Sequence, residues 1–196
     1  MSRHRSSIFD VSFIDQQQVV SEWLAEEQSK PSAPKFDIET DDQRHEVEAK
    51  ILAHKPGVAR NLLSLNLSWI RCRLSERALR DVYTIWGDPE ERDTVEAAVN
   101  RIRAGGSSPH PSSLDRITGL AENAPDDWGT LIIVHHHHSW RRGTPALIDG
   151  NHRATAAILR AEEQGQYEPR QAYVGYSGPS KVSDIRRWLH ASLRTL

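Results

Sequence analysis

Five consecutive residues, Asp149, Gly150, Asn151, His152 and Arg153, combine side-chain types that bind anions and move protons. They follow an apolar run and precede a segment with helical periodicity, so the sequence predicts a strand, a turn and a helix in succession. The first turn of a helix presents unpaired backbone N–H groups and the positive end of the helix dipole. A glycine lets the chain turn sharply and lets an anion approach the backbone. The pattern therefore predicts an anion site at a helix N-terminus.

Each of these side chains also has a purely structural interpretation. Asp149 or Asn151 could cap the helix, His152 could be a satisfied polar residue, and Arg153 could pair with a surface carboxylate. In the functional interpretation, the Arg153 guanidinium matches the oxygens of a phosphate. His152 is then a candidate proton carrier, because its reference pKa lies near neutrality. Glycine, histidine and arginine within four residues favour the anion site over a simple cap.

A run of four histidines, residues 135–138, lies in a polar stretch between two predicted strands. Alternate side chains of a strand point to opposite faces, so one metal ion could bind at most a pair such as 135 and 137. We interpret the run as a solvated hairpin tip. The Trp-Arg-Arg cluster at 140–142 could stack on a base or contact a phosphate, or it could simply be tip surface. The chain has no Walker-type loop, zinc-binding cysteine pair or Gly-x-Ser-x-Gly elbow.

Periodicity predicts the elements that would position the turn. The predicted strands are 69–74, 130–134, 145–148 and 171–176, with a hairpin between the second and the third. The predicted helices are 41–54, 79–86, 89–104, a helix after Asn151, one after Ser180, and a weaker one within 1–28 that has Val20, Trp23 and Leu24 on one face. Residues 105–127 are rich in Gly, Ser, Pro and Asn and are expected to form a loop with about one helical turn.

The order of these segments resembles the ParB/sulfiredoxin superfamily over residues 66–196. In sulfiredoxins a β-hairpin leads to a Gly-Gly-Cys-His-Arg turn, a helix, a strand and a Ser-x-x-Asp-Leu-Arg-x-Tyr-Leu helix. Upstream lie a Leu-Ile-Arg-Pro-Leu strand and an Asp-Pro-x-Lys segment. The matching segments here are 69–74, 88–89, 149–153, 171–176 and 180–189. The resemblance implies an α/β (α+β) domain with a small mixed sheet flanked by helices, preceded by an N-terminal helical arm.

The resemblance also implies that the turn binds ATP or another nucleoside triphosphate. Backbone N–H groups and the arginine of the turn would hold phosphates, and the arginine of the first strand would face the same pocket. A family serine on the Asp-Pro helix falls near Thr94. The implied phosphate-binding residues are Gly150, Asn151, His152, Arg153, Arg71 and Thr94.

The implied catalytic residues are Asp149, as a Mg²⁺ ligand or as the base for an acceptor hydroxyl, and His152 as the other proton carrier. Two positions depart from the family. Asn151 replaces the sulfiredoxin cysteine and is not a nucleophile, which excludes sulfinic-acid reduction by that route. The family lysine on the Asp-Pro helix falls at Glu91.

Three functions are compatible with these residues. The leading hypothesis is an ATP-dependent phosphotransferase, similar to superfamily members that phosphorylate small molecules such as free serine, or an NTP hydrolase with Mg²⁺ as co-ion. Its catalysis would rest on positioning and charge stabilisation. The second hypothesis is a non-catalytic ParB-like module that senses a nucleotide or acts in connection with DNA. The third is a nuclease.

The composition of the chain narrows the class of protein, the partners and the compartment that we expect. The 196 residues carry a net charge of −2, with 37 % hydrophobic and 27 % charged residues, which is typical of a soluble protein. The balance disfavours nucleic acid as a partner without excluding it, because backbone binding needs clustered Lys and Arg. The single cysteine, Cys72, predicts a reducing cytoplasm. The chain has no apolar stretch near the ~20 residues that span a bilayer and no apolar core of a signal peptide.

The organisation predicted from sequence has three parts. An arm at 1–40 ends in a linker-like run and packs on the domain or on a partner. A helical lead-in at 41–65 connects it to the domain at 66–196. The oligomeric state is open, and a homodimer is one option.

Overall fold

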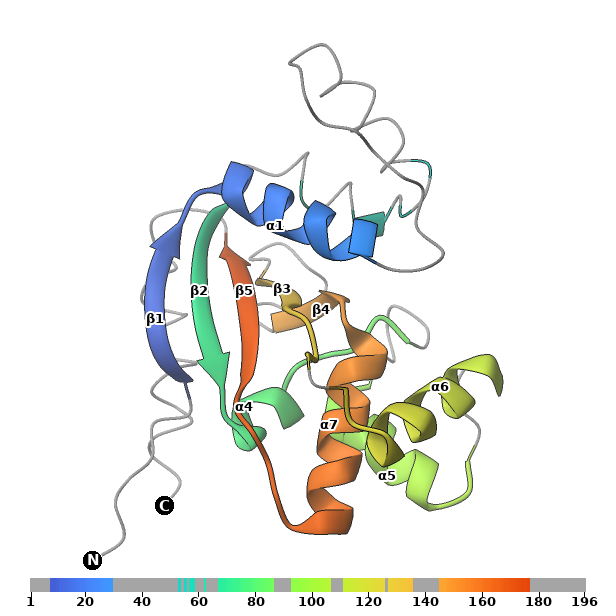
Figure 1. Cartoon of the computed structure of the whole chain (residues 1–196). Helices are drawn as coiled ribbons and strands as arrows, with labels where there is room; N and C mark the ends of the chain where they lie inside the picture. The colour runs from blue at the N-terminus through green and yellow to red at the C-terminus, as the bar shows by residue number, and fades with distance from the viewer. Residues whose placement is uncertain are drawn as a thin grey trace, which may run out of the picture.

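The computed structural model describes residues 8–29, 53, 55, 57–58, 62, 67–86, 93–106, 111–125, 127–135 and 145–176. Within these ranges the chain forms a five-stranded mixed sheet with helices on both of its faces (Figure 1). This architecture is α+β, in agreement with the strand and helix patterns of the sequence. The predictions for residues 88–89, 136–144 and 180–189, and for nearly all of 41–54, lie outside the described residues.

The sheet consists of β1 (Ile8–Ile14), β2 (Ser68–Leu74), β3 (Leu131–His135), β4 (Pro145–Asp149) and β5 (Arg170–Tyr176). Their order across the sheet is β1-β2-β5-β3-β4. Neighbouring strands are antiparallel except for β3 and β5, which run parallel. The predicted hairpin is confirmed, because β3 and β4 pair directly. All four predicted strands are present, each within one residue of its expected bounds.

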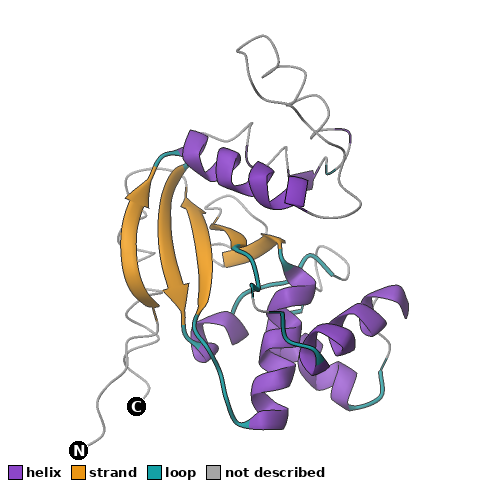
Figure 2. Cartoon of the chain, in the orientation of Figure 1, coloured by secondary structure: helices purple, strands orange, loops and turns teal. Residues whose placement is uncertain are grey.

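Helices cover the two faces of the sheet unequally (Figure 2). On one face lie α4 (Glu76–Arg80), α5 (Val95–Arg103), α6 (Pro111–Glu122) and α7 (Asn151–Gln164). The other face carries α1 (Gln16–Ser29). Because strand side chains alternate, neighbouring residues of β5 enter different cores: Val174 packs on the α7 side and Tyr173 on the α1 side. The sheet thus separates two apolar cores.

Residues 8–29 pack on the rest of the chain, which is one of the two alternatives that the sequence left open for the arm. The helical pattern is confirmed in α1, where Trp23 and Leu24 are buried. The sequence pattern does not predict β1. Its pairing with β2 has an irregularity between Phe9 and Ser12, and Asp10 there has a φ of 53°. Such a bulge breaks the alternation that marks a strand.

Two predictions for the face of the sheet opposite α1 are wrong. The helix expected at 79–86 ends after Arg80, and Tyr83 exchanges backbone hydrogen bonds with Pro145 and Leu147 at 3.0 and 2.8 Å. Pairing with β4 satisfies both backbone polar groups of Tyr83, which outweighs helical spacing. The loop expected at 105–127 contains the twelve-residue helix α6, with Ile117 and Ala121 buried one turn apart. The serines and the glycine of α6 are typical of loops, so the sequence of this segment did not indicate a helix.

Candidate anion-binding site

The junction between β4 and α7 has the predicted strand–turn–helix form. β4 ends at Asp149, and α7 begins at Asn151. Gly150 between them has a φ of 89°, in the left-handed region that side-chain-bearing residues avoid. A Cβ at this position would also collide with the Leu131 side chain. Behind the turn, buried Ala154, Ala157, Ile158 and Ala161 hold α7 against the sheet, as the apolar spacing predicts.

Among the described residues, no side chain caps the N-terminus of α7. The interpretation of Asp149 or Asn151 as a cap is therefore wrong. Asn151 is buried, and its Oδ1 accepts a hydrogen bond from the backbone N–H of Ile85 at 2.9 Å. This contact ties the turn to the segment after α4. The first N–H groups of a helix have no acceptor within the helix itself, so this end keeps its capacity to bind an anion.

His152 is half-buried beside the Trp86 ring, at 5.3 Å between ring centroids in an edge-on arrangement. Burial lowers the pKa of His152 to about 4, with a further lowering by the positive charge of Arg116 and a smaller opposing effect of Asp149. The imidazole is therefore neutral at physiological pH. It can offer or accept a hydrogen bond, and in the unliganded protein its pKa lies below the near-neutral value that is typical of a proton carrier.

Arg153 is held inside the protein rather than presented to solvent. Its Nη1 pairs with the Glu26 carboxylate of α1 and also donates to the carbonyl oxygen of Trp128 at 3.2 Å. Its Nη2 donates to the carbonyl oxygen of Thr130 at 3.1 Å. Gly129 makes room for this arrangement, because a Cβ there would collide with the guanidinium and with Glu26. Arg153 thus pairs with a carboxylate, as its structural interpretation predicts, but the partner Glu26 is partly buried and not at the surface.

Asp149 points toward α1. Its Oδ2 accepts a hydrogen bond from Trp23 Nε1 at 3.1 Å and lies 3.6 Å from Arg153, and its Oδ1 lies 3.3 Å from Lys55 Nζ. Lys55 and Arg153 lie against the two oxygens of this carboxylate, where a Mg²⁺ ion would bind, so Asp149 as arranged is not a preformed Mg²⁺ ligand. Among the described residues, no three His, Cys, Asp or Glu side chains are grouped to hold a metal ion.

The other two predicted phosphate-binding residues lie on different sides of the sheet. Arg71 of β2 is on the α1 side, where its Nη2 is 2.6 Å from Glu22 Oε1 and its guanidinium lies over the Tyr173 ring. Thr94 is the N-cap of α5, and its side chain accepts a hydrogen bond from Ala97 N–H at 3.1 Å. The structure therefore brings Arg71, Arg153 and Asp149 to the face under α1 and gives Thr94 a capping role.

No protein-family model, curated protein or solved structure matches this chain. Any function must therefore be argued from the site itself.

The sequence did not identify the carboxylates of α1 as part of the site. Glu22 and Glu26 lie one helical turn apart and meet Arg71 and Arg153, which are 49 and 127 residues away in the chain. Glu27 pairs with Lys55 at 2.8 Å. The i, i+4 spacing of Glu22 and Glu26 beside Trp23 was visible in the sequence. Their partners were not, because no local pattern relates residues so distant.

Two further residues differ from expectation or lack a chemical role. His135, expected in a solvated tip, is the last residue of β3 and is 1 % exposed. Cys72 is buried, and burial raises the pKa of its thiol to about 12, which leaves it without thiolate character at neutral pH.

Within the described ranges, no helix has the length and apolar composition needed to cross a bilayer.

Proposed function

We propose that this protein binds the phosphate groups of a nucleotide at residues 150–153 and acts as an ATP-dependent phosphotransferase or NTP hydrolase of ParB/sulfiredoxin-like type. The observation that carries the proposal is the start of α7. A left-handed Gly150 leads into a helix that no side chain in the described part of the structure caps, and the arginine of the first turn lies beside it. Backbone N–H groups, a helix dipole and a guanidinium are the elements of a phosphate site.

The arrangement around the turn supports the finer assignment to a ParB/sulfiredoxin-like domain. A hairpin of β3 and β4 precedes the turn, α7 follows it, and β5 then enters the sheet between β2 and β3. Arg71 lies on the strand that pairs with β5. This is the order of elements on which the resemblance in sequence rests.

Mg²⁺ in this proposal is bound mainly by the phosphates of the nucleotide, as is usual for this ion. Because Lys55 and Arg153 neutralise Asp149, the chain offers no preformed cage for it within the described residues. The positive charge at the phosphates would come from arginine side chains and the helix N-terminus.

The binding step can be tested by calorimetric titration of ATP and CTP, each with MgCl₂, into the wild type and into Arg71→Lys. Lysine keeps the charge but loses the planar fork that matches phosphate. We expect the variant to bind about tenfold more weakly, equivalent to about 1.4 kcal/mol. Arg103→Lys is the matched control, because Arg103 also pairs with a glutamate but lies on α5. If the wild type binds neither nucleotide, or if both variants lose affinity equally, the proposed site is wrong.

The catalytic step can be tested with Asp149→Asn, which keeps the shape of the side chain and removes its charge. We expect nucleotide binding to persist, while phosphate release or transfer falls by ~10²-fold or more, the low end for a positioned acid or base. Asp115→Asn, at an exposed site on α6, is the control for the change in net charge. Full turnover in Asp149→Asn would remove Asp149 from catalysis.

A second candidate function is a nucleotide-sensing module without catalysis. The contacts of Asp149 favour it, because a carboxylate held by Trp23, Lys55 and Arg153 is poorly placed to accept a proton. This module would bind nucleotide with Arg71-dependent affinity and release no phosphate. The same titration, followed by an assay of phosphate release from wild type, separates the two functions.

A further inference from the structure

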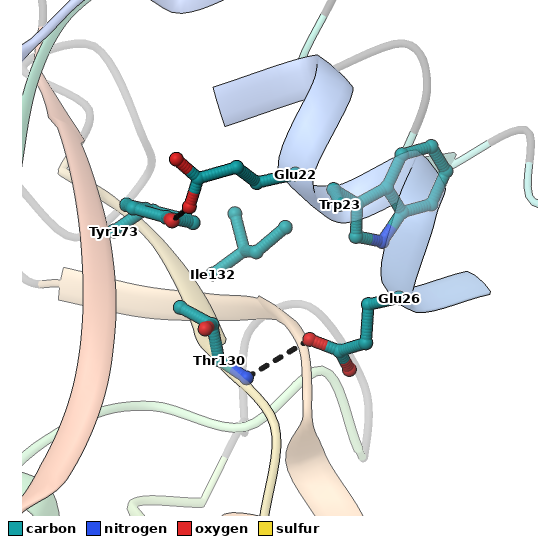
Figure 3. Close-up of a pocket in the computed structure, with 6 residues that line it drawn as sticks. All are labelled: Glu22, Trp23, Glu26, Thr130, Ile132 and Tyr173. Atoms are coloured by element: carbon teal, nitrogen blue, oxygen red, sulfur yellow. Dashed lines mark hydrogen bonds between the residues drawn. The ribbon is translucent and has the colours of Figure 1, made fainter. Parts of the chain in front are cut away.

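Two carboxylates of α1 each bind a pair of donors that belong to the sheet, to α7 or to the residue just before β3. Glu22 accepts from Arg71 Nη2 at 2.6 Å and from the Tyr173 hydroxyl. Glu26 accepts from Arg153 Nη1 and from the backbone N–H of Thr130, the latter at 2.9 Å. Figure 3 shows Glu22 extending from the helix toward Tyr173 and Glu26 extending toward Thr130. Each carboxylate therefore occupies a guanidinium and a second hydrogen-bond donor.

These donors would form an anion site even without the glutamates. Guanidinium groups combined with a hydroxyl or a backbone N–H bind carboxylate and phosphate oxygens through charge-assisted hydrogen bonds. Among the described residues, nothing accepts a hydrogen bond from the buried Nε of Arg71. A phosphate, with three or more oxygens, could satisfy this donor as well as Nη2, whereas Glu22 does not.

The space between the two glutamates is too small for a ligand as the protein is arranged. A cavity of about 10 Å³ lies there, lined by Glu22, Glu26, Thr130, Ile132 and Tyr173 with Trp23 (Figure 3). Such a volume is close to the minimum that one water molecule needs. Within this cavity, a ligand can bind both arginines only by taking the place of the carboxylates.

The charges under α1 lead to the same conclusion. The cations Lys55, Arg71 and Arg153 face the carboxylates of Glu22, Glu26, Glu27 and Asp149. Each of these cations is paired with a carboxylate, so an added anion has to compete with Glu22 and Glu26 for Arg71 and Arg153. Among the described residues, removing Glu22 and Glu26 leaves three cations facing the carboxylates of Glu27 and Asp149.

We propose that Glu22 and Glu26 occupy a two-point anion site in which a ligand with two negatively charged groups replaces them. A nucleotide, whose phosphate chain carries several negative charges, is a ligand of this kind. This inference rests on the proposed function for the identity of the ligand. Buried Val19 and Trp23 keep α1 docked while the two carboxylates swing away.

Calorimetric titration of ATP, inorganic tripolyphosphate and succinate into wild type, Glu22→Gln, Glu26→Gln and the double variant tests this inference. Glutamine preserves the shape and can still accept a neutral hydrogen bond, so α1 should remain docked. Circular dichroism and the thermal midpoint check that each variant is folded, and either single variant serves if the double variant is not. Glu163→Gln, at an exposed position on α7, is the control for net charge.

We expect Glu22 and Glu26 to leave the site free in about one wild-type molecule in ten, which weakens the apparent affinity of wild type about tenfold. The double variant should therefore bind ATP and tripolyphosphate about tenfold more tightly than wild type. The control should match wild type. If wild type binds ATP and the variants bind no more tightly, the built-in competition is wrong and the proposed function stands. Tighter binding of succinate alone would keep the two-point site and overturn the nucleotide function. If no protein binds any probe, both proposals fail.

Discussion

The imidazole of His152 illustrates how the surroundings of a residue alter the chemistry that its type suggests. A histidine beside a phosphate site suggests an acid or base near neutrality. In the folded protein, burial against Trp86 and the charge of Arg116 favour the neutral ring. His152 at the start of α7 therefore acts as a neutral hydrogen-bonding group whose protonation opposes folding.

This shift in pKa predicts a dependence of stability on pH. The pKa of His152 is lowered from 6.5 to about 4 on folding, so the unfolded chain binds a proton between these values while the folded chain does not. Stability should therefore be complete above pH 6.5 and decline as the pH falls toward 4. His152→Gln should show a shallower decline in the free energy of unfolding, measured by urea titration at several pH values in this interval. An unchanged slope would mean that His152 is protonated in the folded state.

At the scale of single elements, the start of α5 offers a test that distinguishes a structural role of one residue from a ligand-binding role. Thr94 is the N-cap of α5, whereas the family resemblance predicts a phosphate ligand at this position. Thr94→Ala should lower the free energy of unfolding by ~1 kcal/mol, the typical cost of a lost cap, and Thr94→Ser should restore it. Nucleotide affinity should be the same in all three proteins, because the hydroxyl is engaged with Ala97 N–H. A loss of affinity in Thr94→Ala that serine restores would support the role as a ligand.

Local patterns predicted those elements whose side chains alternate or repeat cleanly. β2, β5 and the β3–β4 hairpin have continuous or alternating apolar residues, and α7 has alanines at helical spacing, so all were predictable. β1 was not, because its bulge interrupts the alternation. The helix expected at 79–86 was interrupted by the pairing of Tyr83 with β4, which depends on tertiary structure.

The same distinction holds within the site. The turn at 149–153 follows from sequence, because a glycine between an apolar strand and a helical segment allows the left-handed conformation that Gly150 adopts. The contacts of Arg71, Asp149 and Arg153 with α1 do not, because they join residues that are far apart in the chain. Sequence thus identified groups that could bind an anion but not the glutamates that bind them in the folded protein.

At the scale of the whole molecule, β1 presents an apolar edge. Phe13 is 82 % and Val11 50 % exposed, and within the described part of the chain no strand pairs with the outer side of β1. Exposed apolar edges promote pairing between molecules. We expect Phe13→Lys to weaken self-association in sedimentation experiments and to change stability by no more than ~0.5 kcal/mol. A wild type that stays monomeric at high concentration would show that this edge is not used for association.

The place of β5 has consequences for biosynthesis. It is the last strand of the described chain, yet it lies between β2 and β3, and its Cys72–Ala172 pairing joins early and late segments. A nascent chain that has not reached Tyr176 can form only two separate ladders, β1 with β2 and β3 with β4, each with an open edge. Such intermediates are prone to aggregate. A premature stop codon between α7 and β5 should therefore yield insoluble chains rather than partly active ones, and translation speed over this last stretch should affect yield.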